Sequence, residues 1–131
     1  MRLLLDTCVF LWLIWDAREL PEQVREVIAD PEHELWLSSI SIWEACQKHR
    51  LGKLKLHAPE GAWVHFVTQR DAHGVQGLPF NERDVQHLAH LPILHRDPFD
   101  RMLICQAIER GLTLVSPDPV IRRYPLRTLW S

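Results

Sequence analysis

Four acidic residues occupy positions where a carboxylate is costly unless it has a partner. Asp6 and Glu44 each interrupt an otherwise apolar stretch. Asp100 lies in the first turn of a predicted helix, and Asp118 follows a predicted strand. A carboxylate in such surroundings is paired, protonated or bound to a metal ion. Several carboxylates that converge form an oxygen-ligand site for Mg²⁺ or Mn²⁺, and the matching chemistry is metal-assisted hydrolysis of phosphodiester bonds.

Each acid also has a simpler structural interpretation. Asp6 or Thr7 can cap the helix that follows them. Glu44 can pair with Lys48 one helical turn later, and Asp118 can act as a turn residue between two prolines. Taken singly, the simpler interpretation is favoured for each residue, because short motifs are weak evidence. Taken together, the positions beyond strand ends favour a shared site.

Two acids compete for a role at the start of the predicted helix 98–110. Pro98 suits the first helical position, which makes Asp97 the capping residue. Asp100 then has no capping duty, so we assign it to the metal and keep Asp97 as a supporting or substitute ligand. Arg101 can contact phosphate there, or it can pair with these same acids or remain in solvent.

The elements that position these residues follow from the hydrophobic pattern. Short apolar runs predict strands at 2–5, 35–37, 75–78, 112–115 and 127–130. Helical spacing and capping residues predict helices at 8–15, 21–29, 40–49 and 98–110, and two more that begin at Pro59 and Asn81. Strands that alternate with helices indicate an α/β fold with a parallel sheet. Ligands bind beyond the carboxyl ends of such strands, which is where Asp6 and Asp118 lie.

Size and composition indicate one globular domain over residues 1–131. Hydrophobic residues make up 47% of the 131 residues, so the chain can bury a core. Its formal net charge of −2 gives no global attraction to nucleic acid, so such binding needs a local basic patch. The three cysteines match no zinc spacing and indicate reduced thiols. The apolar N-terminal run is interrupted by Asp6 and is too short for a bilayer, so we expect a cytoplasmic protein without membrane contact.

Histidines and tryptophans are assigned structural roles. His87 and His90 are three residues apart, with His95 close after them, but no standard zinc pattern is completed there. We therefore expect an exposed polar face at these histidines. Three of the six tryptophans suit either the core or an interaction surface, and the core is the favoured prediction: Trp12, Trp15 and Trp43.

The chain also resembles a known family. Five motifs carry the resemblance, in this order: LLLDT at 3–7, SIWE at 41–44, RLGKL at 50–54, HRDPFDRMLI at 95–104 and GLTLVSPD at 111–118. Together they look like the PIN-domain ribonucleases, and most of all like the VapC-type toxins of bacterial toxin–antitoxin modules. The resemblance covers essentially the whole chain, and five ordered motifs are far more specific than any one of them.

The resemblance implies a PIN-like three-layer α/β/α fold with a central, mostly parallel sheet. It also implies a Mg²⁺- or Mn²⁺-dependent endoribonuclease that acts as a toxin on RNA. Asp6 and Asp100 match the family positions most often treated as metal ligands, and Glu44 and Asp118 match the remaining acids of the site. The hydroxyl residue near the last acid matches Ser116. A cognate antitoxin and a homodimer are the partners that the resemblance implies.

Three other functions compete with this interpretation. A catalytically inactive PIN-fold binding module would have broken acids, whereas all four are present. A DNA-directed metal nuclease of the flap type needs added substrate-binding elements for which 131 residues leave no room. A phospho-receiver domain, by analogy, needs a lysine near its last strands, and no lysine follows Lys55. The ribonuclease is therefore the favoured hypothesis.

Overall fold

A single sheet of parallel strands forms the centre of the molecule. The structure, a computed structural model, describes residues 1–131. Every neighbouring pair of strands is parallel, in the order β3-β2-β1-β4-β5. The strand bounds are β1 Arg2–Leu5, β2 Glu34–Ser38, β3 Gln76–Leu78, β4 Thr113–Val115 and β5 Thr128–Leu129. The α/β class with a parallel sheet is therefore confirmed.

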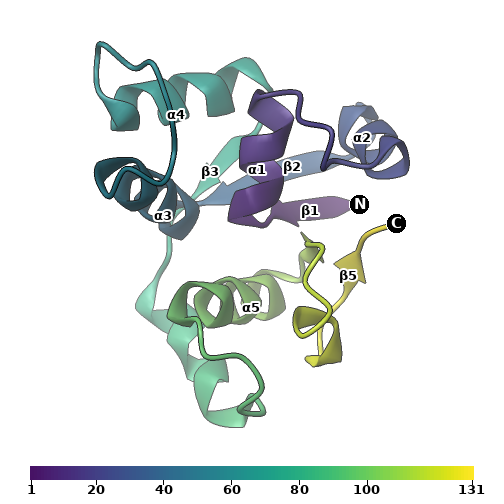
Figure 1. Ribbon diagram of the computed structural model, residues 1–131. Helices are drawn as coiled ribbons and strands as arrows, with labels where there is room; N and C mark the ends of the chain where they lie inside the picture. The colour runs from purple at the N-terminus through teal and green to yellow at the C-terminus, as the bar shows by residue number, and fades with distance from the viewer.

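Helices cover both faces of this sheet. Figure 1 shows α1, α2 and α4 on one side of the strands and α5 on the other. The helix bounds are α1 Thr7–Ile14, α2 Glu22–Ala29, α3 Ser39–Arg50, α4 Ala62–Ala72 and α5 Pro98–Arg110, with 3₁₀ helices η1 Glu82–His90 and η2 Ile121–Arg123. This confirms the three-layer α/β/α arrangement. None of these helices combines the length and the apolar composition needed to cross a membrane.

The central strand contributes side chains to two separate cores. Leu3 and Leu5 pack with residues of α1 and α2, whereas Leu4 packs with residues of α5. All three leucines are completely buried. A strand covered on both faces has no solvent side, which explains why its sequence is continuously apolar instead of alternating. The strand ends where these buried leucines are followed by Asp6, the first polar residue after them.

The helix expected from Asn81 is present as the 3₁₀ helix η1. Asp84 is completely buried there, and its Oδ2 accepts the backbone N–H of Asn81 at 2.8 Å. Its other oxygen lies 3.5 Å from Nε of Arg110 at the end of α5. These contacts attach η1 to α5, the helix that carries Asp97 and Asp100 at its start.

The tryptophans depart from the expectation of a core position. Trp15 is 41% exposed and Trp43 is 63% exposed, so the core prediction was wrong for both. Trp12 is half-buried against the ring of Trp130. In α3, the helical period turns Ile42 and Ala45 toward the core and therefore turns Trp43 outward. Trp43 lines a groove of about 950 Å³ between α3 and α4.

The packing of the sheet can be tested at Leu114 in β4, which is completely buried. The Leu114→Ala substitution leaves a cavity, so we expect the free energy of unfolding to fall by about 2–5 kcal/mol in urea denaturation. Ile93 is 92% exposed and provides the matched control. Ile93→Ala is expected to change stability by less than about 0.5 kcal/mol. Equal losses in the two variants would contradict the burial of Leu114 in the core.

Candidate active site

Four carboxylates from separate elements converge at the carboxyl edge of the sheet. Asp6 directly follows β1 and Asp118 follows β4, while Glu44 lies within α3 and Asp100 in the first turn of α5. The negative charges of Glu44 and Asp118 act on Asp6, and those of Asp6 and Glu44 act on Asp100. We call these four residues the acidic cluster. The structure thus brings together all four acids that the sequence singled out.

Asp6 is held by two hydrogen bonds at the start of α1. Its Oδ1 accepts the backbone N–H of Thr7 at 2.7 Å, and its Oδ2 accepts the hydroxyl of Ser116 at 2.7 Å. Burial raises the pKa of Asp6 to about 6, the bonds from Ser116 and Thr7 oppose this rise, and the charges of Glu44 and Asp118 add to it. Asp6 therefore caps α1 and belongs to the acidic cluster at the same time.

Buried hydroxyl groups connect the loops that carry the acids. Ser116 is completely buried, donates to Asp6, and accepts the backbone N–H of Asp118 at 3.1 Å. Thr7 donates its hydroxyl to Ser41 at 2.9 Å, which joins the starts of α1 and α3. Asp118 also accepts a backbone N–H two residues later through Oδ1, at 2.8 Å. Asp118 is therefore a turn residue and a member of the acidic cluster at the same time, and the bond in the turn orients its carboxylate.

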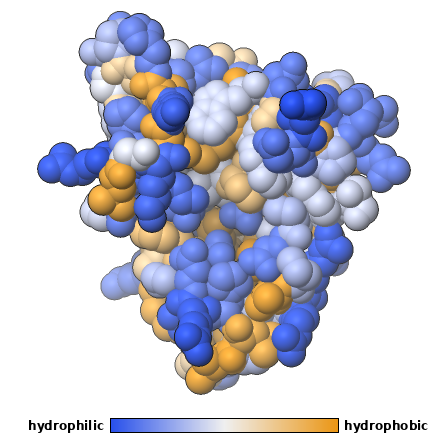
Figure 2. Space-filling view, in the orientation of Figure 1, coloured by the Kyte–Doolittle hydropathy of each residue, from blue (hydrophilic) through white to orange (hydrophobic).

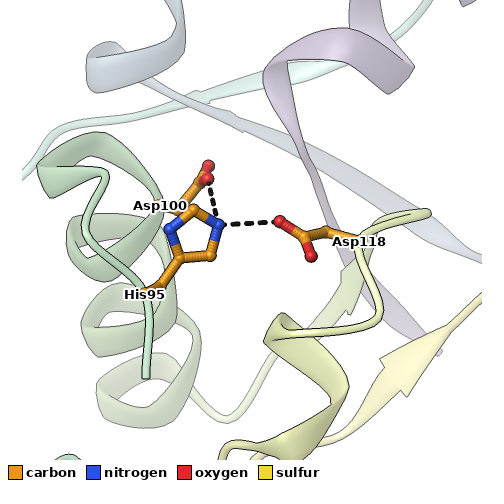
Figure 3. Close-up of side chains that lie close together, drawn as sticks. All are labelled: His95, Asp100 and Asp118. Carbon is orange, nitrogen blue, oxygen red and sulfur yellow. Dashed lines mark hydrogen bonds and ion pairs between the residues drawn. The ribbon is translucent and has the colours of Figure 1, made fainter. Parts of the chain in front are cut away.

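His95 lies against the acidic cluster, a position that the sequence did not predict. Its Nε2 lies 2.7 Å from Oδ2 of Asp118 and 3.0 Å from Oδ2 of Asp100 (Figure 3). The prediction of an exposed polar face was wrong for His95, because the segment before α5 turns the ring toward the carboxylates. Ligand atoms of the three side chains lie within 4.8 Å of one another, close enough to surround one ion.

The hydrogen bonds of His95 define its present role. Nδ1 accepts the backbone N–H of Asp97 at 3.1 Å, so the proton of the neutral ring is assigned to Nε2. Nε2 then donates to the carboxylates and is not free to coordinate a metal. Burial lowers the pKa of His95, but the hydrogen bond to Asp118 and the charges of Asp100, Asp118 and Asp97 outweigh burial and raise it. His95 thereby offsets part of the negative charge around it.

Asp100 carries the larger perturbation of the two strongly shifted acids. Burial raises the pKa of Asp100 to about 7, with further increases from Asp6, Asp97 and Glu44 and a decrease from His95. At neutral pH the protein alone therefore does not keep all four carboxylates ionised. A bound proton or a bound cation must compensate part of the negative charge of the acidic cluster.

The other predicted residues surround the cluster to different degrees. Glu44 is buried, and its Oε2 lies 3.7 Å from Nζ of Lys48, so the expected ion pair is also present. Asp97 caps α5 by accepting the backbone N–H of Phe99 at 2.9 Å. Arg101 makes no ion pair with these acids, and it lines a separate small cavity. The structure therefore does not bring Arg101 into the acidic cluster.

Sequence reasoning missed two residues that shape the site. The hydroxyl oxygen of Tyr124 accepts the backbone N–H groups of Leu94 and His95, at 3.2 and 2.7 Å. This buried tyrosine holds the segment that presents His95 to the acids. The available signal for His95 was its place two residues before the helix cap Asp97. No local pattern pointed to Tyr124, which contacts this segment from 29 residues away.

The donor set of the acidic cluster suits a divalent metal ion. Mg²⁺ and Mn²⁺ favour carboxylate oxygens, and the four segments supply such oxygens at one half-buried edge. The raised pKa values of Asp6 and Asp100 indicate carboxylates that lack a positive partner strong enough to keep them ionised. A bound cation would supply that partner, so the residues present fit such an ion.

Comparison with known protein families identifies the fold. A family model described as the PIN domain matches residues 3–126. The chain belongs to the PIN domain family. The expected resemblance to PIN-domain proteins is confirmed, and the acidic cluster lies entirely within the matched residues of this PIN domain. No curated protein matches the chain at a significant level.

Solved structures show the same fold as this PIN domain. VapBC2 from Rickettsia felis, bound to a promoter DNA fragment, has a TM-score of 0.71 at 18% identity, covering 98% of each chain. DNA-bound VapBC from Salmonella typhimurium has a TM-score of 0.71 at 21% identity, covering 98% of this chain and 97% of that one. VapBC-1 from nontypeable Haemophilus influenzae has a TM-score of 0.70 at 20% identity, with coverage of 98% and 97%.

The crowding of carboxylates in the PIN domain predicts a pH-dependent stability without metal. The pKa of Asp6 is about 6 in the folded protein, against 3.8 for an ordinary aspartate. Protonated Asp6 therefore contributes to the free energy of unfolding. This contribution is complete below pH 3.8 and is lost as the pH rises through 6. In EDTA at pH 8, we therefore expect Asp6→Asn to be more stable than the parent by about 1–3 kcal/mol, and at pH 4 to match it. Urea denaturation at both values measures the difference.

Glu26 is exposed and pairs with no basic side chain, so Glu26→Gln is the control for this experiment. Its stability relative to the parent should not change between pH 4 and pH 8. A pH-independent difference between Asp6→Asn and the parent would show that Asp6 is not destabilised by ionisation.

Proposed function

We propose that this PIN domain is a Mg²⁺- or Mn²⁺-dependent endoribonuclease that acts as the toxin of a toxin–antitoxin pair. The observation that carries the proposal is the convergence of Asp6, Glu44, Asp100 and Asp118 at the carboxyl edge of a PIN sheet. PIN domains are generally nucleases. All four acids are in place, which disfavours an inactive binding module. We take residues 1–131 as one domain.

The proposed partners follow from the structural neighbours. The similar structures include several VapBC complexes, which supports a VapC-type toxin with a cognate antitoxin. We extend the proposal to a homodimer that cleaves RNA. The three cysteines are free thiols, as the reducing cytoplasm favours, and we place the protein there.

In the proposed mechanism, Asp6 and Asp100 hold the metal ion, and Glu44 and Asp118 order water or hold a second ion. Mg²⁺ or Mn²⁺, when bound, supplies polarisation of the phosphoryl group and a lowered pKa of bound water. The hydroxyl of Ser116 fixes one oxygen of Asp6, which sets the direction of the other lone pairs. Burial at the sheet edge lowers the local dielectric constant, so the carboxylates would attract a divalent cation strongly, and that cation would offset their repulsion of a phosphate.

His95 and Lys48 have supporting roles in this mechanism. His95 keeps a proton on Nε2 between Asp100 and Asp118 and so limits their mutual repulsion. Lys48 pairs with Glu44 at 3.7 Å and restricts its orientation. Neither side chain donates to an oxygen of Asp6. The arrangement leaves the carboxylates, and not the histidine, as the groups that bind the ion.

The metal requirement can be tested with purified protein and a single-stranded RNA. Cleavage should require Mg²⁺ or Mn²⁺ and stop in excess EDTA, because without the ion nothing polarises the phosphoryl group or lowers the pKa of the attacking water. Asp6→Asn and Asp100→Asn should each abolish cleavage with a native circular dichroism spectrum. Ser116→Ala should weaken metal affinity by about 10- to 100-fold. Glu26→Gln is the control with unchanged activity, and undiminished turnover in EDTA would refute the mechanism.

The toxin role can be tested in cells. Expression of the chain without a partner should arrest growth, because unrestrained RNA cleavage stops translation. Asp100→Asn should relieve the arrest at an equal level of protein, measured by immunoblot. Growth arrest that persists in the Asp100→Asn variant would point to a cause other than catalysis.

A further inference from the structure

The groove between α3 and α4 carries two exposed indole rings. Its volume is about 950 Å³, and Trp43 of α3 and Trp63 of α4 both line it. These two side chains are 63% and 62% exposed. The Nε1–H of Trp43 donates to Oε1 of Gln47 at 2.8 Å, and this bond holds the indole in one orientation. Two exposed aromatic side chains in one groove mark an interaction surface.

Every charged residue that lines this groove is basic. They are Arg50, at the end of α3, and Arg70 of α4. Arg70 pairs with Asp71, and its guanidinium lies over Gly77, where an added Cβ would be 2.8 Å from Nη1. Arg50 is exposed and forms no ion pair, so its charge is available to a ligand. The groove thus presents positive charge, and no negative charge, to an occupant.

The positive charge continues in the connection that follows α3. Residues 45–59 contain no acidic residue, although the whole chain has a formal net charge of −2, and all three lysines lie in this stretch: Lys48, Lys53 and Lys55. Lys53 and Lys55 are exposed and form no ion pair. The backbone N–H of Lys53 donates to the carbonyl of Lys48 at 2.9 Å, which turns the connection back onto the end of α3. Figure 2 shows strongly hydrophilic side chains that project where Figure 1 places α3. This is the local basic patch that nucleic-acid binding requires in a chain without net positive charge.

The groove and the acidic cluster lie on neighbouring sides of α3. Figure 1 shows α3 between α4, which forms the other wall of the groove, and α5, which carries Asp100. Trp43 and Glu44 are consecutive residues, so their side chains point about 100° apart around the helix axis. Trp43 lines the groove, and the charge of Glu44 acts on the other acids. A ligand that crosses this single step of α3 therefore contacts both.

The groove also reaches the edge of the sheet at which the acids lie. Its lining includes Leu78, the last residue of β3, and Ser39, the first residue of α3. Leu78 is in register with Ser38 at the end of β2. Because all the strands are parallel, these residues lie at the same edge as Asp6, which follows β1. One end of the groove is therefore at the carboxyl edge.

We propose that this groove and the basic residues after α3 bind the single-stranded RNA that leads into the acidic cluster. This inference rests on the proposed ribonuclease function and names the surface that holds its substrate. Bases stack on the indole rings of Trp43 and Trp63, since every base offers an aromatic face. Arg50, Lys53 and Lys55 contact the phosphate groups. The strand then crosses α3 beside Trp43 and places a phosphodiester at the acids.

Charge favours RNA over a second copy of this chain as the occupant of the groove. A two-fold contact brings the same residues of both copies together, so two copies joined by this surface would place like charges against each other. A strand of RNA instead carries a negative phosphate and an aromatic base in every nucleotide, and so supplies partners for the basic residues and for the indoles. The acidic cluster itself repels phosphates, so the affinity for RNA must come from a positive surface beside it.

RNA binding without cleavage tests this surface. The parent protein is the Asp100→Asn variant in Mg²⁺, and a fluorescein-labelled oligouridine of about twelve nucleotides is titrated by fluorescence anisotropy. We expect Trp43→Ala and Trp63→Ala each to weaken binding by about 5- to 100-fold, because each removes a stacking surface. Trp15 is 41% exposed and lies at the C-terminal end of α1, so Trp15→Ala is the matched control with unchanged binding. Equal binding by all three variants, or no binding by the parent, overturns the proposal.

The salt dependence of this binding tests the phosphate contacts. On a single strand, the logarithm of the affinity falls with the logarithm of the salt concentration by about 0.7 for each phosphate contacted. A triple variant with Arg50→Gln, Lys53→Gln and Lys55→Gln should therefore reduce this slope by about 2. Arg18 is exposed and forms no ion pair, so Arg18→Gln is the control with an unchanged slope. An unchanged slope in the triple variant would contradict the proposal.

Cleavage kinetics separate this proposal from the function on which it rests. With Mn²⁺ and a single-stranded RNA that the wild type cleaves, Trp43→Ala and Trp63→Ala should raise KM and leave kcat nearly unchanged, because the indoles bind the substrate away from the reacting bond. Cleavage with an unchanged KM overturns the RNA-binding surface alone. Binding of oligouridine by a wild type that cleaves no RNA supports the surface and overturns the ribonuclease.

Light scattering identifies the alternative occupant. If Trp43→Ala converts a dimer into a monomer while RNA binding is unchanged, the groove is an interface between two copies, and the RNA proposal is overturned. The same oligomeric state in Trp43→Ala and the wild type, together with weakened RNA binding in Trp43→Ala, supports the proposal.

Discussion

Four carboxylates that lose water and repel one another at one edge of the sheet are the constraint on which the rest of the site depends. Parallel strands end at one edge, so the acids that follow β1 and β4 necessarily meet there. Burial removes the water that would otherwise screen them, and the pKa values of Asp6 and Asp100 rise to about 6 and about 7. A fold that served only stability would gain by replacing these groups. Their presence in such a position agrees with a site whose stability is completed by a cation.

The surrounding structure keeps the acids close together in spite of this repulsion. Ser116 is completely buried and bonds to both Asp6 and Asp118. Tyr124 holds the backbone at His95, whose ring contacts Asp100 and Asp118. These bonds come from loops and helix starts that flank the sheet, not from the strands themselves. The strands supply a rigid edge, and the short loops supply the polar groups that orient the carboxylates.

The sequence predicted the parts of the molecule that local patterns determine. Asp6 and Asp118 could be placed at one edge because each follows an apolar strand, and the cap at Asp97 could be read from the proline after it. His95 could not be placed in this way, because it lies outside any periodic element and is oriented by a contact with Tyr124, 29 residues later. The exposed position of Trp43 was missed for a different reason, because the local pattern did encode it. Ile42 and Ala45 form the core-facing side of α3, and the same helical period turns Trp43 outward.

The first turn of α5 connects the acid on this helix to the acid that follows β4. Asp97 caps the helix by accepting the backbone N–H of Phe99, and Pro98 suits the first helical position. Asp100 follows the cap by three residues, so the capped first turn sets the direction from which its carboxylate meets the other acids. His95 lies just before the cap, and its ring contacts both Asp100 and Asp118. The short segment from His95 to Asp100 therefore positions one acid of the cluster and holds it beside another, which the strands alone could not do.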